Sequence, residues 1–440
     1  MIELISLVYA LVILILTKKD IRYGIGGYIF ICIFPNIQGR EIFGITGFNA
    51  MNIIFLGVVL KYYLPRFSGR IKIKSDKLPL IEFILILLLL QITFMLRYLD
   101  EYYLLGNIRS MVVTFVELIV KPIEYYLILY FLYKSINSIK EIKIFLLILI
   151  SAGVVGVIVL FWQVTITKIS YSEIFWNNFA GHKNTWGVKV ALLDIITLVT
   201  FLLTKNKKWK IFALISFVLG LGVLIFSLSR TAWVAFAVGT IFIMYKSNLK
   251  KALLFIPLVF IVISSTPLAD KIIERMGREN AEANTSQLNK ITAGRVEKKW
   301  LPQIEAIEEN PLFGGGTVGL LGHSGYLAVW NQIGLLGLLI TSYIFIKMYF
   351  DLNKIHQATR DKSEFVRIIT LTGLTLLLMV PIINITCSVV FFRLNDAPSL
   401  LMIGFFYISG IKIKNIYLNE YLKKINFNYN VKQEELQVVK

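Results

Sequence analysis

The sequence predicts an all-α, polytopic integral membrane protein with about 12 to 14 transmembrane helices and one larger extracytoplasmic loop. The 440-residue chain is 57% hydrophobic and has a mean hydropathy of +0.71, whereas soluble domains hold about 45–50% apolar residues. Its apolar runs approach the roughly 20 residues that a helix needs to cross a bilayer. Short basic clusters separate these runs, as the positive-inside rule predicts for cytoplasmic loops.

Composition also excludes several classes of function. The formal net charge of +19 suits nucleic acid, but the basic residues lie between apolar runs, so we expect membrane lipids and no nucleic acid as partners. Cys32 and Cys387 lie far apart in apolar segments without metal-ligand spacing, so we predict buried thiols, no metal and no cofactor. No stretch is long enough for a separate soluble domain, so residues 1–440 form a single membrane domain.

The apolar runs predict about thirteen helices, with an even number near 12 or 14 as the alternative. The first run is followed, not preceded, by Lys18-Lys19 and lacks a small-residue cleavage site, so we expect a retained helix, not a signal peptide. The second run is short and contains glycines. The predicted helices lie near residues 2–17, 24–36, 45–62, 78–96, 110–133, 143–165, 184–204, 210–227, 230–246, 251–267, 324–347, 366–391 and 397–412.

The basic clusters predict the orientation of these helices. Counting crossings places all the strong clusters on one side, which the positive-inside rule identifies as the cytoplasm. Residues 412–440 then form a cytoplasmic tail, and residues 268–322 form the large extracytoplasmic loop. The clusters are Lys61 to Lys77, Lys134 to Lys143, Lys205 to Lys210, Lys246 to Lys251, Lys347 to Arg367 and the tail after Lys412.

The large loop contains a pattern typical of a short amphipathic helix at the membrane interface. Its apolar residues recur at helical spacing. Asn310-Pro311 and the glycine run 314–316 follow and should turn the chain back towards the membrane. The spaced apolar residues are Val296, Trp300, Ile304 and Ile307.

Arg230 interrupts an apolar stretch that runs from Ile211 to Tyr245. This stretch would be roughly 52 Å long as a helix, enough for two short crossings and too long for one. Its midpoint places Arg230, flanked by Ser227 and Ser229, at the tip of a hairpin on the outer face. An arginine facing hydrocarbon costs about 2.5–3.5 kcal/mol, so Arg230 should face a cavity or an anion. A snorkelling interfacial arginine is the alternative.

Arg295 and His323 flank the loop helix on the same predicted outer face. Arg295 precedes free helix N–H groups and is a candidate phosphate ligand, with a solvated loop arginine as the alternative. His323 follows a glycine-rich turn, and its neutral imidazole could accept a proton from a hydroxyl, with a capping histidine as the alternative. Two cations and one base are what sugar transfer from a diphosphate leaving group requires.

Other polar residues are weaker candidates. His182, Lys183 and Asn184 precede the seventh predicted helix on the outer side and could bind sugar hydroxyls or phosphate, unless they form an ordinary loop. Arg393 lies between the last two helices, where an ion pair with Asp396 is the alternative to substrate binding.

Charged residues inside the predicted helices are functional candidates by default. Glu117, Lys121 and Glu124 share one face of the fifth helix, where i,i+4 pairing is an equally good structural account. Asp194 lies in the seventh helix, and the sequence indicates no partner.

One motif resembles a known family. His323-Ser324, nine further residues and then Gly334-Leu335-Leu336-Gly337 meet the pattern H-[NSQ]-x9-G-x-x-G. The chain therefore resembles the bacterial O-antigen ligase and Wzy-type polysaccharide polymerase superfamily. Ser229-Arg230, and Gly294-Arg295 before a Trp-containing helix, Asn-Pro and a glycine turn, also look like this family. The resemblance covers roughly residues 175–345, and the N-terminal helices fit only by number and hydropathy.

The resemblance implies a metal-independent glycosyltransferase in the bacterial cytoplasmic membrane, with its active site on the outer face. The donor would be an undecaprenyl-diphosphate-linked glycan and the acceptor a glycan or lipid-linked molecule; a chain-length regulator and a flippase are further partners. By resemblance, His323 is the acceptor-activating base, and Arg230 and Arg295 hold the diphosphate. The remaining candidates for substrate contact are Ser229, Ser324, His182, Lys183, Asn184 and Arg393.

The sequence favours a polymerase over a ligase that transfers glycan to a lipid A core. The outer loop is compact, and the Lys/Ile/Asn-rich composition suggests an AT-rich genome, which many organisms without lipopolysaccharide have. A flippase or other transporter is the alternative from a different class, but the notable polar residues gather on one face and no long repeat is present.

Gly334 and Gly337 are expected to permit close packing of their helix against a neighbouring one.

Overall fold

The computed structural model describes residues 2–32, 42–45, 47–67, 77–104, 115–166, 183–227, 229–247, 296, 300–314, 324–386 and 397–438. These residues contain thirteen α-helices, one short π-helix and no strand, which confirms the predicted all-α class. The predicted helix at 251–267 and most of the predicted loop 268–322 lie outside the described residues. The elements are α1 (Ile2–Lys19), α2 (Ile21–Cys32), α4 (Ala50–Phe67), α5 (Ile81–Leu104), η1 (Val116–Val120), α7 (Lys121–Ser135), α8 (Ile139–Ile166), α10 (Lys183–Leu203), α11 (Lys207–Phe226), α12 (Arg230–Ser247), α17 (Leu301–Glu308), α18 (Gly325–Thr359), α19 (Glu364–Thr386) and α20 (Ala397–Val438).

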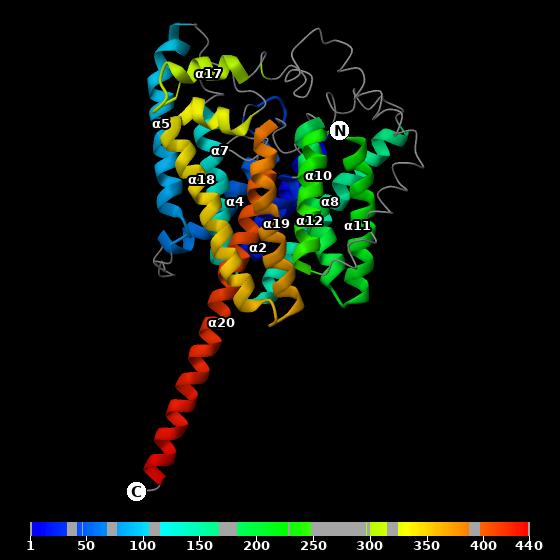
Figure 1. Ribbon diagram of the computed structural model, residues 1–440, viewed down its shortest axis with the longest axis vertical. Coiled ribbons are helices and arrows are strands. Elements are labelled where there is room, and N and C mark those ends of the chain that lie inside the picture. The colour runs from blue at the N-terminus through cyan, green and yellow to red at the C-terminus, as the bar shows by residue number, and fades with distance from the viewer. Residues whose placement is uncertain are drawn as a thin grey trace.

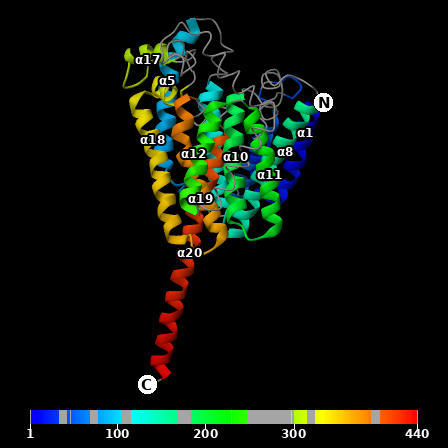
Figure 2. The ribbon, with the colours of Figure 1, turned by 45° about the vertical axis from the view of Figure 1, so that its right-hand side comes forward.

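The membrane helices stand side by side in one bundle (Figure 1). Seven of the described helices are long and apolar enough to cross a membrane, and two shorter apolar helices accompany them. The N-terminus and α17 lie at one end of the bundle, and α20 extends beyond the other end (Figures 1 and 2). The predicted tail after residue 412 is therefore helical as far as Val438, as a continuation of α20.

Basic side chains gather at the end from which α20 emerges. Lys61, Arg66 and Lys134, which come from α4 and α7, line one cavity there. Lys205 and Arg367, from the segment after α10 and from the start of α19, line another. This gathering agrees with the single-sided placement that the sequence predicts. We call this the basic end, and we call the opposite end, which carries α17, the loop end.

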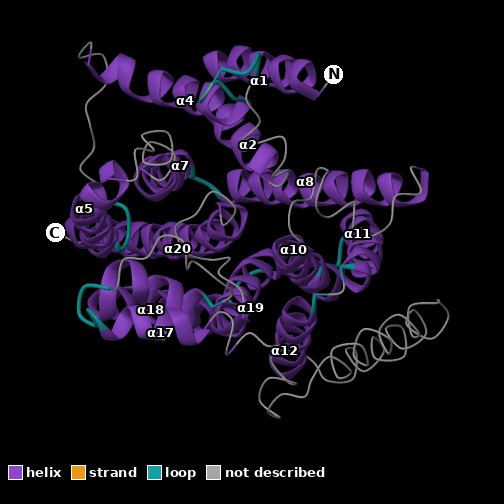
Figure 3. Ribbon diagram, turned by 90° about the horizontal axis from the view of Figure 1, so that it is seen from above, coloured by secondary structure: helices purple, strands orange, loops and turns teal. Residues whose placement is uncertain are grey.

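Helices α10 and α19 are the most buried membrane helices of the bundle. In the candidate spans of α10 and α19, 83% and 78% of residues are buried, against 28% for those of α4 and α18. Gly239 of α12 explains how three helices pack closely, because a Cβ there would lie 2.9 Å from Ile195 of α10 and from Met379 of α19. Seen along the bundle, α10, α12 and α19 lie next to one another (Figure 3).

The C-terminal part of the predicted amphipathic loop helix is present, and residues 297–299 of it lie outside the described residues. It spans Leu301–Glu308 and buries Gln303, Ala306 and Ile307. Ile304, one of the spaced apolar residues, is 37% exposed. A turn of 100° per residue places Ile304 beside the buried residues of this helix.

Candidate functional site

The tip of the hairpin between α11 and α12 presents Arg230 at the loop end of the bundle. Ser227 Oγ donates a hydrogen bond to the carbonyl of Leu224 (2.7 Å) and accepts one from the Ser229 amide (3.2 Å). Ser229 Oγ caps the first turn of α12 by accepting from the Ala232 amide at 3.5 Å. Both serine side chains are buried, whereas Arg230, the first residue of α12, is half-buried. The predicted place of Arg230 at a hairpin tip is confirmed.

The start of α10 packs directly against this tip. A Cβ at Gly187 would lie 2.8 Å from both Ser227 Oγ and Ser229 Cβ, so only a glycine allows this approach. Lys183 and Asn184 are the first two residues of α10 and therefore begin at the same end as Arg230. The start of α10 and the hairpin tip with Arg230, which were separate candidates for substrate binding in the sequence, therefore lie together in the structure. His182 lies outside the described residues.

The start of α18 is held by the end of α19. Ser324 Oγ is the N-cap, accepting from the Leu327 amide (3.5 Å), and it donates to the carbonyl of Asn384 (3.3 Å). Tyr326 OH donates to the carbonyl of Pro381 (3.2 Å). Ser324 is 5% exposed, so its hydroxyl serves to anchor the helix start. His323, the predicted base one residue earlier, lies outside the described residues.

The sequence predicted that Gly334 packs α18 against a neighbouring membrane helix. This prediction is wrong, because Gly334 contacts the turn after α17 instead. It has φ 72° and ψ −178° and interrupts the helix, in a region of backbone space that is essentially restricted to glycine. A Cβ there would lie 1.9 Å from the carbonyl oxygen of Leu312. A Cβ at Gly337 would first meet Ile333 of the same helix, at 2.3 Å.

The kink at Gly334 receives the turn that follows α17. The carbonyl of Pro311 accepts hydrogen bonds from the Leu335 amide (3.0 Å) and from Trp330 Nε1 (2.8 Å). Gly314, at φ 89°, approaches the carbonyl of Asn331 so closely that a Cβ would lie 2.3 Å from it. Gly334, the first glycine of the motif, therefore supplies a docking place for this turn, which holds the helix whose start follows His323.

Asn384 is a polar residue near this end that the sequence analysis missed. Its side chain is fully buried, and its Nδ2 donates to the carbonyl of Val380 (3.0 Å). Its Oδ1 has no hydrogen-bond partner among the described residues. The signal in the sequence was an amide three residues after Pro381 in an otherwise apolar run.

The intramembrane charges of the fifth predicted helix form a structural pair. Lys121 Nζ lies 2.6 Å from Glu124 Oε2, and Tyr28 OH donates to Glu124 Oε1 at 2.7 Å. Lys121 also donates to Asn52. This pair has i,i+3 spacing, and the i,i+4 pairing of Lys121 with Glu117 lies outside the described residues. Glu117 belongs to η1, and its side chain lies outside the described residues.

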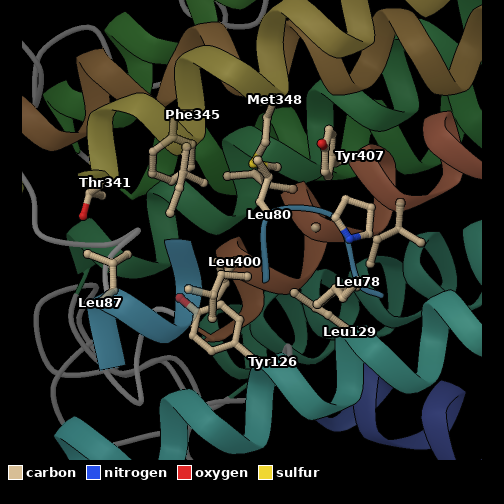
Figure 4. A pocket seen from close by; sticks show the side chains of 16 residues that line it. Leu78, Leu80, Leu87, Tyr126, Leu129, Thr341, Phe345, Met348, Leu400 and Tyr407 are labelled. Atoms are coloured by element: carbon tan, nitrogen blue, oxygen red, sulfur yellow. The ribbon is translucent and has the colours of Figure 1, made fainter. Parts of the chain in front are cut away.

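An apolar cavity lies between α5, α7, α18 and α20. Leu87, Tyr126, Leu129, Met348 and Leu400 are among its lining residues, and side chains from these helices converge on it (Figure 4). Two of its polar groups are already bonded inside the protein. Thr341 Oγ1 donates to the carbonyl of Gly337 (2.7 Å), and Tyr407 OH donates to Asp351 Oδ2 (3.1 Å).

The remaining predicted site residues, Arg295 and Arg393, lie outside the described residues, as does Asp396. What the structure brings together at the loop end are the hairpin tip with Arg230, the start of α10, and the junction of α18 with α19. Helices α12 and α19 link them, because α12 packs on α19 and α19 packs on α18.

Comparison with known proteins agrees with the resemblance seen in the sequence. The family model described as O-Antigen ligase matches residues 215–322. No curated protein matches the chain. The matched segment contains α12 with Arg230, the position of Arg295 and α17, and it ends one residue before His323. The match confirms the resemblance to the O-antigen ligase and Wzy-type polymerase superfamily and indicates a glycan-transferring membrane protein.

Proposed function

We propose that this chain, which resembles the O-antigen ligase and Wzy-type superfamily, transfers glycan from an undecaprenyl-diphosphate-linked oligosaccharide to an acceptor hydroxyl, and that it polymerises repeat units of a capsule, exopolysaccharide or O-antigen. One observation carries the proposal. Within the segment that matches the family, Arg230 stands half-buried at a hairpin tip that buried serines and the start of α10 hold in place.

The chemistry assigns a role to each cation and to the base. The acceptor oxygen forms a bond to the anomeric carbon while the bond to the diphosphate oxygen breaks, so negative charge grows on the departing lipid diphosphate. Arg230, the first residue of α12, stabilises this charge with its guanidinium. Arg295 adds a second guanidinium, and His323 takes the proton from the acceptor hydroxyl.

The secondary candidates divide into contact and positioning roles. Lys183 and Asn184 at the start of α10, with His182 and Arg393, hold sugar hydroxyls or phosphate oxygens. Ser229 and Ser324 are buried in helix caps, so they position Arg230 and the start of α18 and do not touch the donor.

The polyprenyl chain of the donor occupies the apolar cavity between α5, α7, α18 and α20 in this proposal. Bonded polar groups such as Thr341 and Tyr407 leave the cavity with a hydrocarbon lining. Burial of apolar surface contributes about 25 cal/mol per Å², so a long isoprenoid binds such a lining favourably. The loop end then faces the outside of the bacterial cytoplasmic membrane, where a flippase delivers the donor and a chain-length regulator acts on the product.

The test is a reaction of the purified full-length chain in detergent with an undecaprenyl-diphosphate-linked oligosaccharide. We expect longer lipid-linked glycans and released undecaprenyl diphosphate. The Arg230→Ala variant should lose about 10²–10³-fold in rate, the typical effect of removing one donor to a developing oxyanion. Arg360→Ala, which removes an exposed arginine after the other end of α18, is the matched control and should leave the rate unchanged.

The same assay separates the alternatives. A ligase would consume the donor only when a lipid A core or other foreign acceptor is added. A transporter would not consume the donor at all, and this result would contradict the proposal.

A further inference from the structure

A second charged site lies at the basic end of the bundle, away from the proposed active site. It is a cavity with about 1160 Å³ of empty space, formed where α10 ends, α11 and α19 begin and α12 ends. Its polar lining includes four cations that come from two segments far apart in the chain. These cations are Lys205, Lys207, Lys210 and Arg367.

The four cations have no anionic partner within the part of the chain that the structure describes. None of them forms an ion pair there, and Lys210 lies over the ring of Phe201 at 5.4 Å. The carboxylate of Glu364 is nearby, and its Oε1 accepts hydrogen bonds from Thr204 Oγ1 and from the Lys205 amide, both at 2.8 Å, so one negative charge stands against four positive ones. The cavity therefore concentrates positive charge, and an anion entering it would relieve the mutual repulsion of these groups.

The wall of the cavity is apolar on the side of α10. Leu202 and Leu203, the last residues of that helix, line it next to the cations. Ser247 also lines it, and its hydroxyl donates to the carbonyl of Ile243 at 2.6 Å. A ring of cations beside leucines at the end of membrane helices matches a molecule with a phosphate headgroup and hydrocarbon chains. Basic pockets between membrane helices on the cytoplasmic side bind such headgroups.

We propose that this cavity binds a phosphate-bearing anion, the headgroup of an anionic phospholipid from the adjoining leaflet. Arg367 binds the phosphate through its planar guanidinium, which suits bidentate contact with phosphate oxygens. The three lysines surround it as point charges. Leu202 and Leu203 contact the first carbons of the acyl chains.

The cavity is connected to the loop end because the same three helices, α10, α12 and α19, reach both ends of the bundle. Helix α10 begins at Lys183 and ends beside the cavity, α12 runs from Arg230 to Ser247, and α19 runs from the cavity to the region of Asn384. The contacts of Gly239 with Ile195 and Met379 join the three helices midway. A bound headgroup therefore ties together the basic ends of three helices whose loop ends form the candidate site.

The experiment compares two double variants of the purified full-length chain in detergent. Lys207→Gln/Arg367→Gln removes two cations of the cavity. Lys208→Gln/Arg360→Gln removes two cations from the same end that do not line it. Unfolding temperatures are measured after adding dioleoylphosphatidylglycerol, dioleoylphosphatidylcholine or inorganic phosphate at equal phosphate concentration.

We expect phosphatidylglycerol to raise the unfolding temperature of the wild type and of the Lys208/Arg360 variant more than phosphatidylcholine does. In the Lys207/Arg367 variant this excess should fall to less than half. If this excess falls equally in the two double variants, the effect is one of general charge and the proposal is overturned. The proposal is also overturned if the two lipids shift the unfolding temperature of the wild type equally. If inorganic phosphate raises the unfolding temperature as much as phosphatidylglycerol does, the ligand is a free anion and the assignment to a lipid headgroup is overturned.

Native mass spectrometry provides a second readout with the single variants Lys207→Gln and Arg367→Gln, in case the double variant does not fold. Each should retain less phosphatidylglycerol per protein than Lys208→Gln. Equal retention in all three variants would contradict the site. None of these readouts depends on glycan transfer, so they can fail while the proposed function holds, and the reverse is also true.

Discussion

Several single side chains at the loop end hold the backbone in place. The buried hydroxyls of Ser227, Ser229 and Ser324 are engaged in the hairpin tip and in helix caps. Arg230 begins a helix at the same end and is half-buried. A guanidinium at the start of a helix suits a charge that develops on a bound diphosphate.

Gly334 offers a test of the backbone at this scale. Replacing it with alanine forces a side chain into a glycine-only conformation and places a Cβ 1.9 Å from the carbonyl oxygen of Leu312. We expect a loss of about 1–3 kcal/mol in the free energy of unfolding, measured by thermal unfolding in detergent. Gly222→Ala is the control, because nothing lies within 4 Å of a Cβ there. Equal unfolding temperatures for the two variants would contradict the role of the kink.

The Lys121–Glu124 pair gives a second prediction. Both side chains are buried, so Glu124→Gln leaves the lysine charge without its carboxylate and should lower the free energy of unfolding by about 3–5 kcal/mol. Replacing both residues, as Lys121→Met/Glu124→Leu, removes the charge as well and should cost less. Chemical denaturation of the two variants tests this. The account is wrong if the double variant is the less stable of the two.

Sequence patterns predicted the position of Arg230 better than the role of the glycines. The hairpin could be inferred because its apolar stretch is too long for one crossing and lies between basic clusters. The positive φ of Gly334 could not be inferred, because a G-x-x-G spacing in a membrane helix looks the same whether it packs on another helix or admits a loop. Asn384 was missed because one amide in an apolar run carries little signal until its neighbours are known.

At the scale of helices, α10 is central, since it contacts both α11 and α12 and its start packs on the hairpin tip. Its boundaries, Lys183–Leu203, agree with the predicted 184–204 to within one residue. Basic residues and polar turns bound this helix at the membrane surfaces. Helix α20 runs much further than the predicted 397–412, because hydropathy marks the end of a span and not the end of a helix.

The interface of α10 with α11 can be tested through Asp194 and Gly220. Asp194 is 2% exposed, and a Cβ at Gly220 would lie 1.8 Å from its Oδ1. Gly220→Ala should therefore destabilise the wild type but have a smaller effect in Asp194→Ala, with an interaction free energy of about 0.5–3 kcal/mol in a double-mutant cycle. Thermal unfolding of the four proteins measures it. Strict additivity would show that the two residues do not meet.

For the molecule as a whole, the gathering of basic side chains at one end predicts the orientation in the membrane. A cysteine at Phe313, which is 56% exposed at the loop end, should react with a membrane-impermeant maleimide in intact cells. A cysteine at Lys208, at the basic end, should react only after the cells are permeabilised. Both variants are made in a chain whose Cys32 and Cys387 are replaced by alanine. Labelling in the opposite order would invert the orientation and remove the basis for an outer active site.

The most direct test of the central claim, that the loop end catalyses glycan transfer, is complementation of a strain that lacks this protein. Variants His323→Ala and Arg230→Ala are produced at the wild-type level, and the surface polymer is quantified. The account predicts that each variant loses at least about 100-fold of the polymer, while lipid-linked repeat units accumulate and Arg360→Ala behaves as wild type. If both variants at normal levels still support full polymer assembly, the assignment of the site is wrong.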